Sequence, residues 1–255
     1  MSKKSANTAK SNLITVLVLV VFAVGFYYVK GKFFSAAFTR YSEFGIDIPT
    51  NFSIHGIDVS HHQQDISWED VRKMKVKNVQ IDFAFIKATE GISIVDEQYK
   101  ENMEAAKEAG VIRGAYHFFI PTRSGKTQAA NFLETVKLKT GDLPPVLDVE
   151  QTSSNISVKE MQLRIKDWLD IVENKYNVKP IIYSNADFYT TYLANEFDDY
   201  PLWVAHYKVK DKPRINRNWI FWQHSESAQV TGIRTNVDFN VFNGSRYSFN
   251  KLLLE

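Results

Sequence analysis

Two carboxylates stand one residue apart in the stretch PPVLDVE, at residues 144–150. In an extended strand, alternate side chains point to the same face, so Asp148 and Glu150 would share one face while Val149 points to the other. Such a pair can perform acid–base chemistry, because one acid can donate a proton while its neighbour stabilises positive charge. The same spacing also occurs where a strand runs out into solvent, since acids are mostly exposed residues. The rest of the chain has to decide between these interpretations.

Eight apolar, strand-like segments follow residue 54, and helix-like patterns separate the earlier ones. The segments are 55–60, 81–88, 112–120, 145–150, 179–184, 201–207, 219–225 and 236–242. A capping box at Ser157 and Glu160 opens one helical pattern, and Gly110 ends another. This alternation predicts parallel βα units and hence an α/β fold, an irregular (β/α) TIM-like barrel of about eight strands. The last three segments leave too little room for full helices, so we expect the end of the barrel to be irregular.

Polar and charged side chains recur where these strands are predicted to end. Active sites of such barrels lie at the carboxyl ends of the strands, so we expect these side chains to meet at one mouth. They are Asp58, Lys87 with Glu90 just beyond it, Tyr116, Asp148, Glu150, Tyr183, Tyr207, Gln223 and Asp238.

The chemistry of this set points to sugars. It is costly to ionise four crowded carboxyl groups together, here those of Asp58, Asp148, Glu150 and Asp238. Crowding therefore raises the pKa of at least one of them and keeps an acid protonated. Aromatic rings bind the apolar faces of sugars, although such rings are also typical of a barrel core. The aromatic candidates are Tyr116, Tyr183, Trp203 and Tyr207. Carboxylates and rings together predict acid–base cleavage of a glycosidic bond.

Other chemistries fit the sequence less well. The stretch SGKT at 124–127 is similar to the end of a phosphate-binding loop, but the first glycine of that loop would fall at Ile120, so Ser124 is interpreted as a helix cap. The chain has no cysteine, no G-x-S-x-G and no H-E-x-x-H, and we predict no metal ion and no cofactor. All 29 acidic residues follow residue 32, with 26 of the 31 basic ones, and a mildly acidic body argues against a nucleic-acid partner.

An apolar segment near the start predicts a membrane anchor. Residues 13–29 are 17 consecutive residues without a charge, enough to span a hydrocarbon core of about 30 Å. We therefore predict a short cytoplasmic basic tail over 1–12, a transmembrane signal anchor over 13–29 and a linker over 30–53. A catalytic barrel over 54–246, outside the cytoplasm, and a C-terminal tail over 247–255 follow. The alternatives are a cleavable signal peptide ending near residues 35–37, which gives a secreted protein, and a buried core helix.

An ordered set of motifs resembles the lysozymes of glycoside hydrolase family 25. The motifs are GIDVSHHQ, FAFIKATEG, GAYHFF, PPVLDVE, IIYSNADFY, LWVAHY, FWQHS and NVDFN, and they run through about 190 residues, from 54 to 242. The resemblance implies an irregular barrel that cleaves the β-1,4 bond between N-acetylmuramic acid and N-acetylglucosamine in peptidoglycan. It also implies that Glu150 is the general acid, with Asp148, Asp58 and Asp238 as its acidic neighbours.

The mechanism stays open between two routes. In one, the 2-acetamido group of the substrate attacks the anomeric carbon while ionised Asp148 orients that amide and helps to keep Glu150 protonated. In the other, water attacks with the aid of Asp58 or Asp238. A chitinase-like enzyme would need aspartates at 143 and 146, where this chain has leucine and valine. A non-catalytic glycan-binding module is the alternative of another class, and we expect a monomeric catalytic domain.

Overall fold

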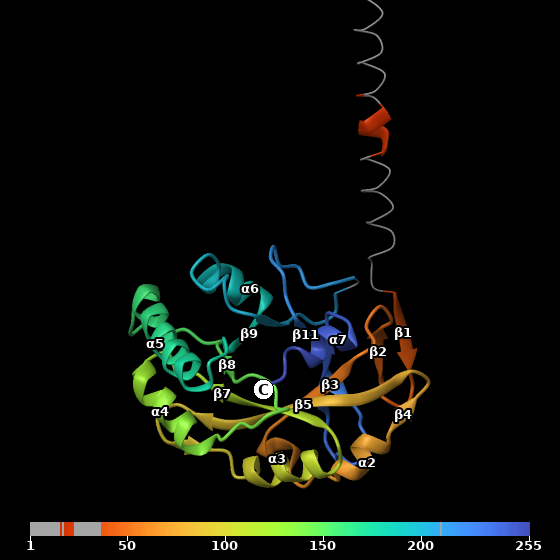
Figure 1. Cartoon of the computed structure of the whole chain (residues 1–255), viewed down its shortest axis with the longest axis horizontal. Helices are drawn as coiled ribbons and strands as arrows, with labels where there is room; N and C mark the ends of the chain where they lie inside the picture. The colour runs from red at the N-terminus through yellow and green to blue at the C-terminus, as the bar shows by residue number, and fades with distance from the viewer. Residues whose placement is uncertain (1–15, 17, 23–36, 210) are drawn as a thin grey trace, which may run out of the picture.

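Eight strands close into a barrel in the computed structural model, which describes residues 16, 18–22, 37–209 and 211–255 (Figure 1). Neighbouring strands follow the order β3 (His55–Val59), β12 (Val237–Phe242), β11 (Phe221–Ala228), β10 (Leu202–Ala205), β9 (Ile181–Asn185), β8 (Val146–Asp148), β7 (Ile112–Phe118) and β5 (Val79–Glu90). Pairing of β5 with β3 closes the ring. Each of the eight predicted segments overlaps one of these strands, so the predicted α/β barrel is confirmed.

The direction of β12 is the main irregularity of the barrel. The other seven barrel strands run parallel to one another, whereas β12 is antiparallel to both β11 and β3. The chain between β11 and β12 spans only residues 229–236, which is too short for a crossover helix. The amino end of β12 therefore lies at the mouth formed by the carboxyl ends of the other strands. The prediction that Asp238 closes a parallel strand is wrong, because Asp238 stands near the beginning of β12.

Helices cover the outer surface of the barrel (Figure 1). They are α2 (Trp68–Lys73), α3 (Tyr99–Glu108), α4 (Gly125–Thr135) and α5 (Val158–Tyr176), and shorter elements are η1 (His61–Gln63), α6 (Ala186–Phe188) and η2 (Tyr189–Leu193). The Ser124 hydroxyl caps α4 by accepting a hydrogen bond from the Thr127 amide. Ser157 caps α5 in the same way through the Glu160 amide. Both serines cap their helices as predicted, but the Glu160 side chain pairs with Arg164 and does not close the predicted capping box.

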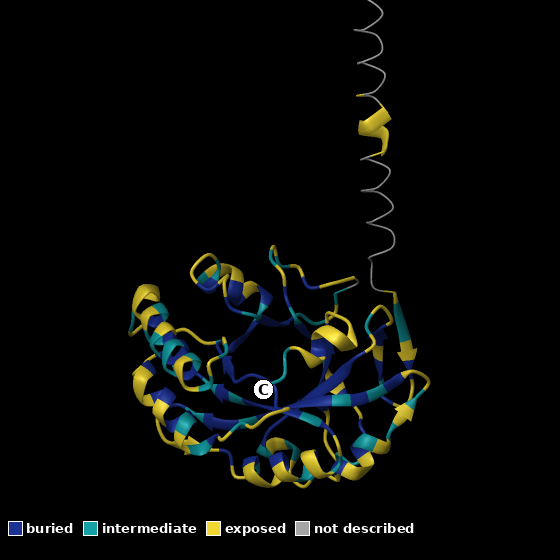
Figure 2. Ribbon diagram, in the orientation of Figure 1, coloured by how far each residue is buried: buried dark blue, intermediate teal, exposed yellow. Residues whose placement is uncertain are grey.

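Buried residues lie along the barrel strands and on parts of the helices around them (Figure 2), and the apolar core has two parts. The larger part fills the layer between the strands and the helices. The smaller part lies inside the barrel, and its rings form what we term the aromatic floor: Phe83, Phe85, Trp203, Phe221, Phe242 and Phe249. Gly56 of β3 faces this floor, and a Cβ atom there would lie 2.5 Å from the Phe83 ring. Glycine is therefore required where β3 passes the rings.

Both ends of the described body pack onto the barrel. Strands β1 (Phe38–Tyr41) and β2 (Ile46–Pro49) form a hairpin within the predicted linker, and its buried side chains include Tyr41 and Ile48. At the other end, α7 (Arg246–Asn250) places Phe249 in the aromatic floor. These parts of the predicted linker and tail therefore belong to the folded body. The remaining short strands are β4 (Lys75–Val76) and β6 (Ile94–Val95), which both pair with β5.

The predicted anchor over 13–29 lies mostly outside the described residues. Residues 16 and 18–22, which are described, are helical. Within the described part of the chain, no helix is both long and apolar enough to cross a membrane.

Candidate active site

Four acidic residues meet at the mouth of the barrel. Asp58 of β3 and Asp238 of β12 are direct partners across two neighbouring strands. Asp148 is the last residue of β8, and Glu150 follows two residues later. Charge on Glu150 raises the pKa of each of the other three carboxyl groups, which places all four within electrostatic reach of one another. The structure thus brings together the four acids that the sequence selects.

Two amides hold the carboxyl group of Asp58 in place. Gln223 Nε2 donates to Asp58 Oδ2 at 2.8 Å, and Asn240 Nδ2 donates to the same oxygen at 2.7 Å. Burial nevertheless raises the pKa of Asp58 to about 6, and the charge on Glu150 adds to this effect, while the two amide hydrogen bonds oppose it. Asp58 is therefore a positioned carboxyl group that changes charge near neutral pH.

The orientation of those amides is fixed by aromatic donors. Tyr183 Oη donates to Gln223 Oε1 at 2.8 Å, and Tyr207 Oη donates to the same oxygen. Trp203 Nε1 donates to Asn240 Oδ1 at 2.8 Å. Because these oxygens accept hydrogen bonds, each amide nitrogen must face Asp58. Hydroxyl and indole groups thus decide which way both amides point.

The two acids of the D-x-E pair are unequally exposed. Asp148 is 7% exposed, and its Oδ1 atom has no hydrogen-bond partner among the residues that the structure describes. Burial raises its pKa well above the ordinary value, and the charges of Glu150 and Asp58 raise it further. Burial also raises the pKa of Glu150, but the positive charge of Lys87 opposes that shift. Both acids are therefore shifted toward their protonated forms, and the charge of Lys87 opposes the shift in each of them.

Asp238 is the most strongly shifted of the acids that carry a definite value. Burial raises its pKa to about 9, and the charges of Asp58, Glu226 and Glu150 contribute in that order. All four carboxyl groups therefore favour their protonated forms, as the crowding of acids predicts.

The comparison with known proteins decides the family. The sequence model of glycosyl hydrolases family 25 matches residues 57–233. The chain belongs to glycosyl hydrolase family 25. The uncharacterized protein YegX of Escherichia coli (strain K12) is 49% identical over 202 residues, which cover 79% of this chain and 74% of that protein. Lysozyme M1 of Streptomyces globisporus is 34% identical over 206 residues, or 75% of this chain and 68% of that protein.

Solved structures share the same barrel. A family 25 glycosyl hydrolase from Bacillus anthracis superposes with a TM-score of 0.74 at 29% identity, over 84% of this chain and 98% of that one. The bacterial lysozyme from Streptomyces coelicolor gives a TM-score of 0.70 at 35% identity, over 79% of this chain and 97% of that one. The sequence-based resemblance is confirmed, and the protein is a glycoside hydrolase. The family match contains Asp58, Asp148 and Glu150 but ends before Asp238, whose place in the site comes from the pairing of β12 with β3.

Lys87 and Glu90 of the family 25 hydrolase form an ion pair at the mouth. Lys87 Nζ lies 2.7 Å from Glu90 Oε2, and the two side chains are 13% and 29% exposed. The same Lys87 charge lowers the pKa of both Asp148 and Glu150. Lys87 is therefore the cation within reach of the D-x-E pair, and it favours the ionised forms of both acids.

Tyr116 faces the acids from β7. Burial raises the pKa of its hydroxyl well above the ordinary value, and the charges of Asp58, Asp148 and Asp238 raise it further. Burial also raises the pKa values of Tyr183 and Tyr207. The three phenols remain protonated, and Tyr183 and Tyr207 donate their protons to Gln223.

Trp203 belongs to the aromatic floor. It is 2% exposed and stacks on Phe85 with ring centroids 4.4 Å apart. The prediction that this indole offers a face to a sugar is wrong, because neighbouring rings cover it. Its contact with the site is the hydrogen bond to Asn240, a residue that sequence reasoning missed. The signal was present in VDFNVF, because Asp238, Asn240 and Phe242 share one strand face.

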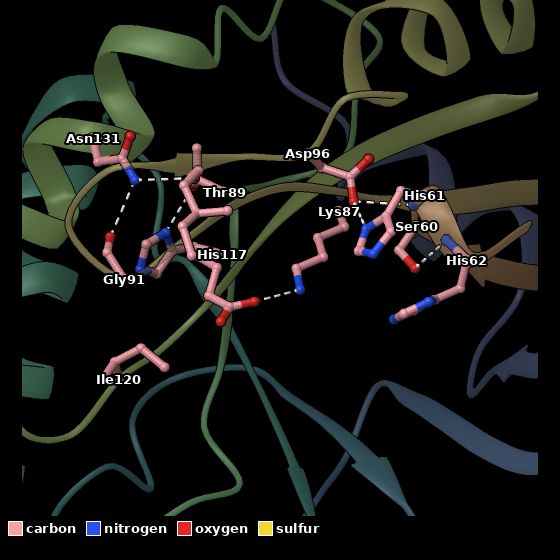
Figure 3. Close-up of polar contacts among 12 residues, drawn as sticks. Ser60, His61, His62, Lys87, Thr89, Gly91, Asp96, His117, Ile120 and Asn131 are labelled. Atoms are coloured by element: carbon pink, nitrogen blue, oxygen red, sulfur yellow. Dashed lines mark hydrogen bonds and ion pairs between the residues drawn. The ribbon is translucent and has the colours of Figure 1, made fainter. Parts of the chain in front are cut away.

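The histidines near the site have structural contacts. His117 is buried, and its Nδ1 lies 2.7 Å from Thr89 Oγ1 (Figure 3). Its Nε2 lies 3.3 Å from Gln128 Oε1. His61 Nδ1 lies 2.7 Å from Asp96 Oδ2. Within the described part of the chain, no group of three or more histidine, aspartate or glutamate side chains is arranged to hold a metal ion.

Proposed function

We propose that this family 25 hydrolase is a lysozyme that cleaves the β-1,4 bond between N-acetylmuramic acid and N-acetylglucosamine in peptidoglycan. The observation that carries the proposal is the pair Asp148 and Glu150 at the carboxyl end of β8, where burial raises the pKa values of both acids. Glycosidic hydrolysis needs one carboxylic acid that is still protonated at working pH and a second carboxyl group beside it. The lysozymes among the relatives support the choice of bond.

Glu150 is the general acid in this proposal. It is the more exposed member of the pair, so a glycosidic oxygen can reach it, and its raised pKa keeps part of it protonated. The proton moves from the Glu150 carboxyl group to the leaving oxygen as the bond to the anomeric carbon breaks. Glu150 then accepts a proton from the incoming water molecule, which restores the starting state.

Asp148 holds the acetamide of the muramic acid unit. Its buried Oδ1 lacks a partner among the described residues, and an unpaired buried polar atom costs free energy until a donor reaches it. The N–H of the 2-acetamido group is a donor of the required kind. With that amide held, its carbonyl oxygen attacks the anomeric carbon, and the product keeps the β configuration.

Asp58 and Asp238 complete the acidic wall opposite this pair. Asp58 is held by Gln223 and Asn240, so its free oxygen keeps a fixed direction toward the mouth. In this proposal the two aspartates and the phenol of Tyr116 bind sugar hydroxyls, with Lys87 and Glu90 as further contacts. Direct activation of water by Asp58 or Asp238 is the competing role, and it would invert the anomeric centre.

Two measurements on purified peptidoglycan test the proposal. Mass analysis of the released fragments should show muramic acid at the new reducing end, as a muramidase requires. Reducing ends made of N-acetylglucosamine, or no release at all, would refute the proposed bond. Proton NMR of the first product should show the β-anomer, whereas an initial α-anomer would reassign Asp58 or Asp238 as the base.

We also propose that residues 13–29 anchor the enzyme in the cell membrane with the barrel outside the cytoplasm, where its substrate lies. The support is the run of uncharged residues with Lys3, Lys4 and Lys10 before it. Fractionation of cells should find the full-length protein with the membranes. A soluble product whose first residue lies near Phe38 would instead show a cleaved signal peptide and a secreted enzyme.

A further inference from the structure

The connection between β5 and β6 exposes an apolar surface at the mouth of the barrel. Ile92, Ile94 and Val95 are 41%, 55% and 50% exposed, and they lie within four consecutive residues. Exposed apolar residues that occur singly are ordinary, but several that follow one another in the chain at the carboxyl end of a barrel strand point to a binding surface. We refer to residues 91–95 as the lip.

Hydrogen bonds from α4 hold the backbone of the lip. Asn131 of α4 donates from Nδ2 to the carbonyl oxygens of Gly91 and Ile94, at 3.1 and 3.2 Å (Figure 3). Gly91 has a φ of +55°, and a Cβ atom there would lie 3.2 Å from Ile120. Residues other than glycine rarely adopt this backbone conformation, so the turn depends on Gly91.

The far end of the lip is tied to the segment that follows the neighbouring strand β3. The Asp96 amide donates to the Ala88 carbonyl at 2.9 Å. The Asp96 carboxylate accepts from the His61 amide at 3.0 Å and from the Gln98 amide at 3.0 Å, and His61 Nδ1 is 2.7 Å away. These bonds join the end of the lip to the segment that follows β3. The exposed apolar side chains are therefore held in place from both sides.

The register of the strands places the lip close to the D-x-E pair. Glu90 pairs with Phe118, and Phe118 pairs with Asp148, so the three residues form one row across β5, β7 and β8. Neighbouring strands lie about 4.8 Å apart, so the lip begins about 10 Å from Asp148. About three residues of extended peptide span that distance.

We propose that the lip binds the peptide stem that muramic acid carries on its lactyl group, an inference that rests on the proposed lysozyme activity. The lip side chains at 92, 94 and 95 are aliphatic and have no hydrogen-bonding groups, so they suit the methyl groups of a stem rich in alanine better than sugar hydroxyls. Sugars are bound better by aromatic rings. A second copy of the chain is a poor occupant, because three half-exposed side chains offer far less than the about 800 Å² that each partner buries in a stable complex.

The test compares two substrates and two variants of the full-length protein. The substrates are uncross-linked peptidoglycan strands with their stems and the same strands after an amidase has removed the stems. The lip variant is Ile92→Ser combined with Ile94→Ser. The control is Leu163→Ser on α5, which removes a side chain of similar exposure, 57%, from an outer helix.

We expect the lip variant to raise KM about tenfold on stem-bearing strands, with kcat within about twofold of the unchanged protein. On stem-free strands its KM should match that of the unchanged protein, and the Leu163→Ser control should be normal on both. An equal rise in KM on both substrates would show a glycan contact and overturn the inference, and so would an unchanged KM on both. Failure of the unchanged protein to cleave either substrate would refute the lysozyme activity itself, which is a separate outcome.

Discussion

The aromatic floor and the acidic mouth lie in the same barrel interior and differ in almost every property. Strand β12 shows the contrast within five residues, because Phe242 lies in the floor, Asn240 above it and Asp238 at the mouth. The floor buries rings against rings, such as Phe83 and Phe221 with centroids 5.0 Å apart. The mouth buries carboxyl groups whose pKa values are all raised.

The difference shows that the two regions have opposite effects on stability. Burial of rings removes apolar surface from water and stabilises the fold. Burial of acids raises their folded-state pKa values, so ionising them as pH increases costs stability. The stability gained by burying the rings of the floor therefore offsets the cost of burying the acids of the mouth. The floor also orients the Asn240 amide through the hydrogen bond from Trp203.

The largest effect should come from removing the proposed acid. Glu150→Gln keeps the size of the side chain but cannot donate a proton to a leaving oxygen, so kcat should fall by about 10² to 10⁴. Initial rates on peptidoglycan measure this, and circular dichroism checks the fold. Glu196→Gln, which changes an exposed acid on the outer surface, should keep full activity. Near-normal turnover by folded Glu150→Gln would remove Glu150 from its role.

A change in the floor should act on stability instead. Phe83→Ala removes a fully buried ring and should lower the free energy of unfolding by about 3–5 kcal/mol. Because Phe83 lies below the acids, kcat per folded molecule should stay within about twofold. Urea unfolding and active-site-normalised rates measure the two quantities. Loss of turnover without loss of stability would contradict the proposed division between floor and mouth.

The connection between the two regions predicts a mixed effect. Trp203→Phe removes the indole donor and leaves the buried Asn240 carbonyl unpaired, which costs about 1–3 kcal/mol of stability. The amide can then turn away from Asp58, so kcat should fall about tenfold. The matched control is Trp219→Phe, which alters an indole in the larger part of the core, between the strands and the helices. If both variants had the same kcat, the floor would not orient Asp58.

The smallest effect should be a dependence of stability on pH. The folded pKa of Asp238 is raised from 3.8 to about 9, so the stability that it contributes at low pH is lost as pH rises from about 4 through about 9. Asp238→Asn cannot ionise, and its melting temperature should exceed that of the unchanged protein by a few degrees at pH 9. Near pH 4 the two should differ by less than about 1 °C. A constant offset across this range would contradict the shift assigned to Asp238.

The sequence predicted the barrel and its acids for reasons that are local. Apolar runs of strand length, helix caps at Ser124 and Ser157, and motifs in a fixed order are all visible along the chain. Asp148 and Glu150 could be paired because strand geometry puts alternate side chains on one face. Asn240 could be found by the same rule, two residues after Asp238.

Other features depend on neighbours that are distant in the sequence. The reversal of β12, the covering of Trp203 by Phe85 and the folding of the hairpin at 38–49 onto the barrel follow from packing between separate segments. The raised pKa values of the D-x-E pair also come from tertiary structure. Burial raises the pKa of both carboxyl groups, and the charge of Lys87 lowers both.

The sequence by itself determined which residues bear the chemistry and which strands carry them, because side-chain type and alternation are written along the chain. Only the tertiary structure decided how strongly each acid holds its proton and which amide faces Asp58. Those properties depend on desolvation and on donors from other strands, as Gln223 and Asn240 show from 165 and 182 residues away. The electrostatic properties of a site are set by the neighbours that folding brings to it.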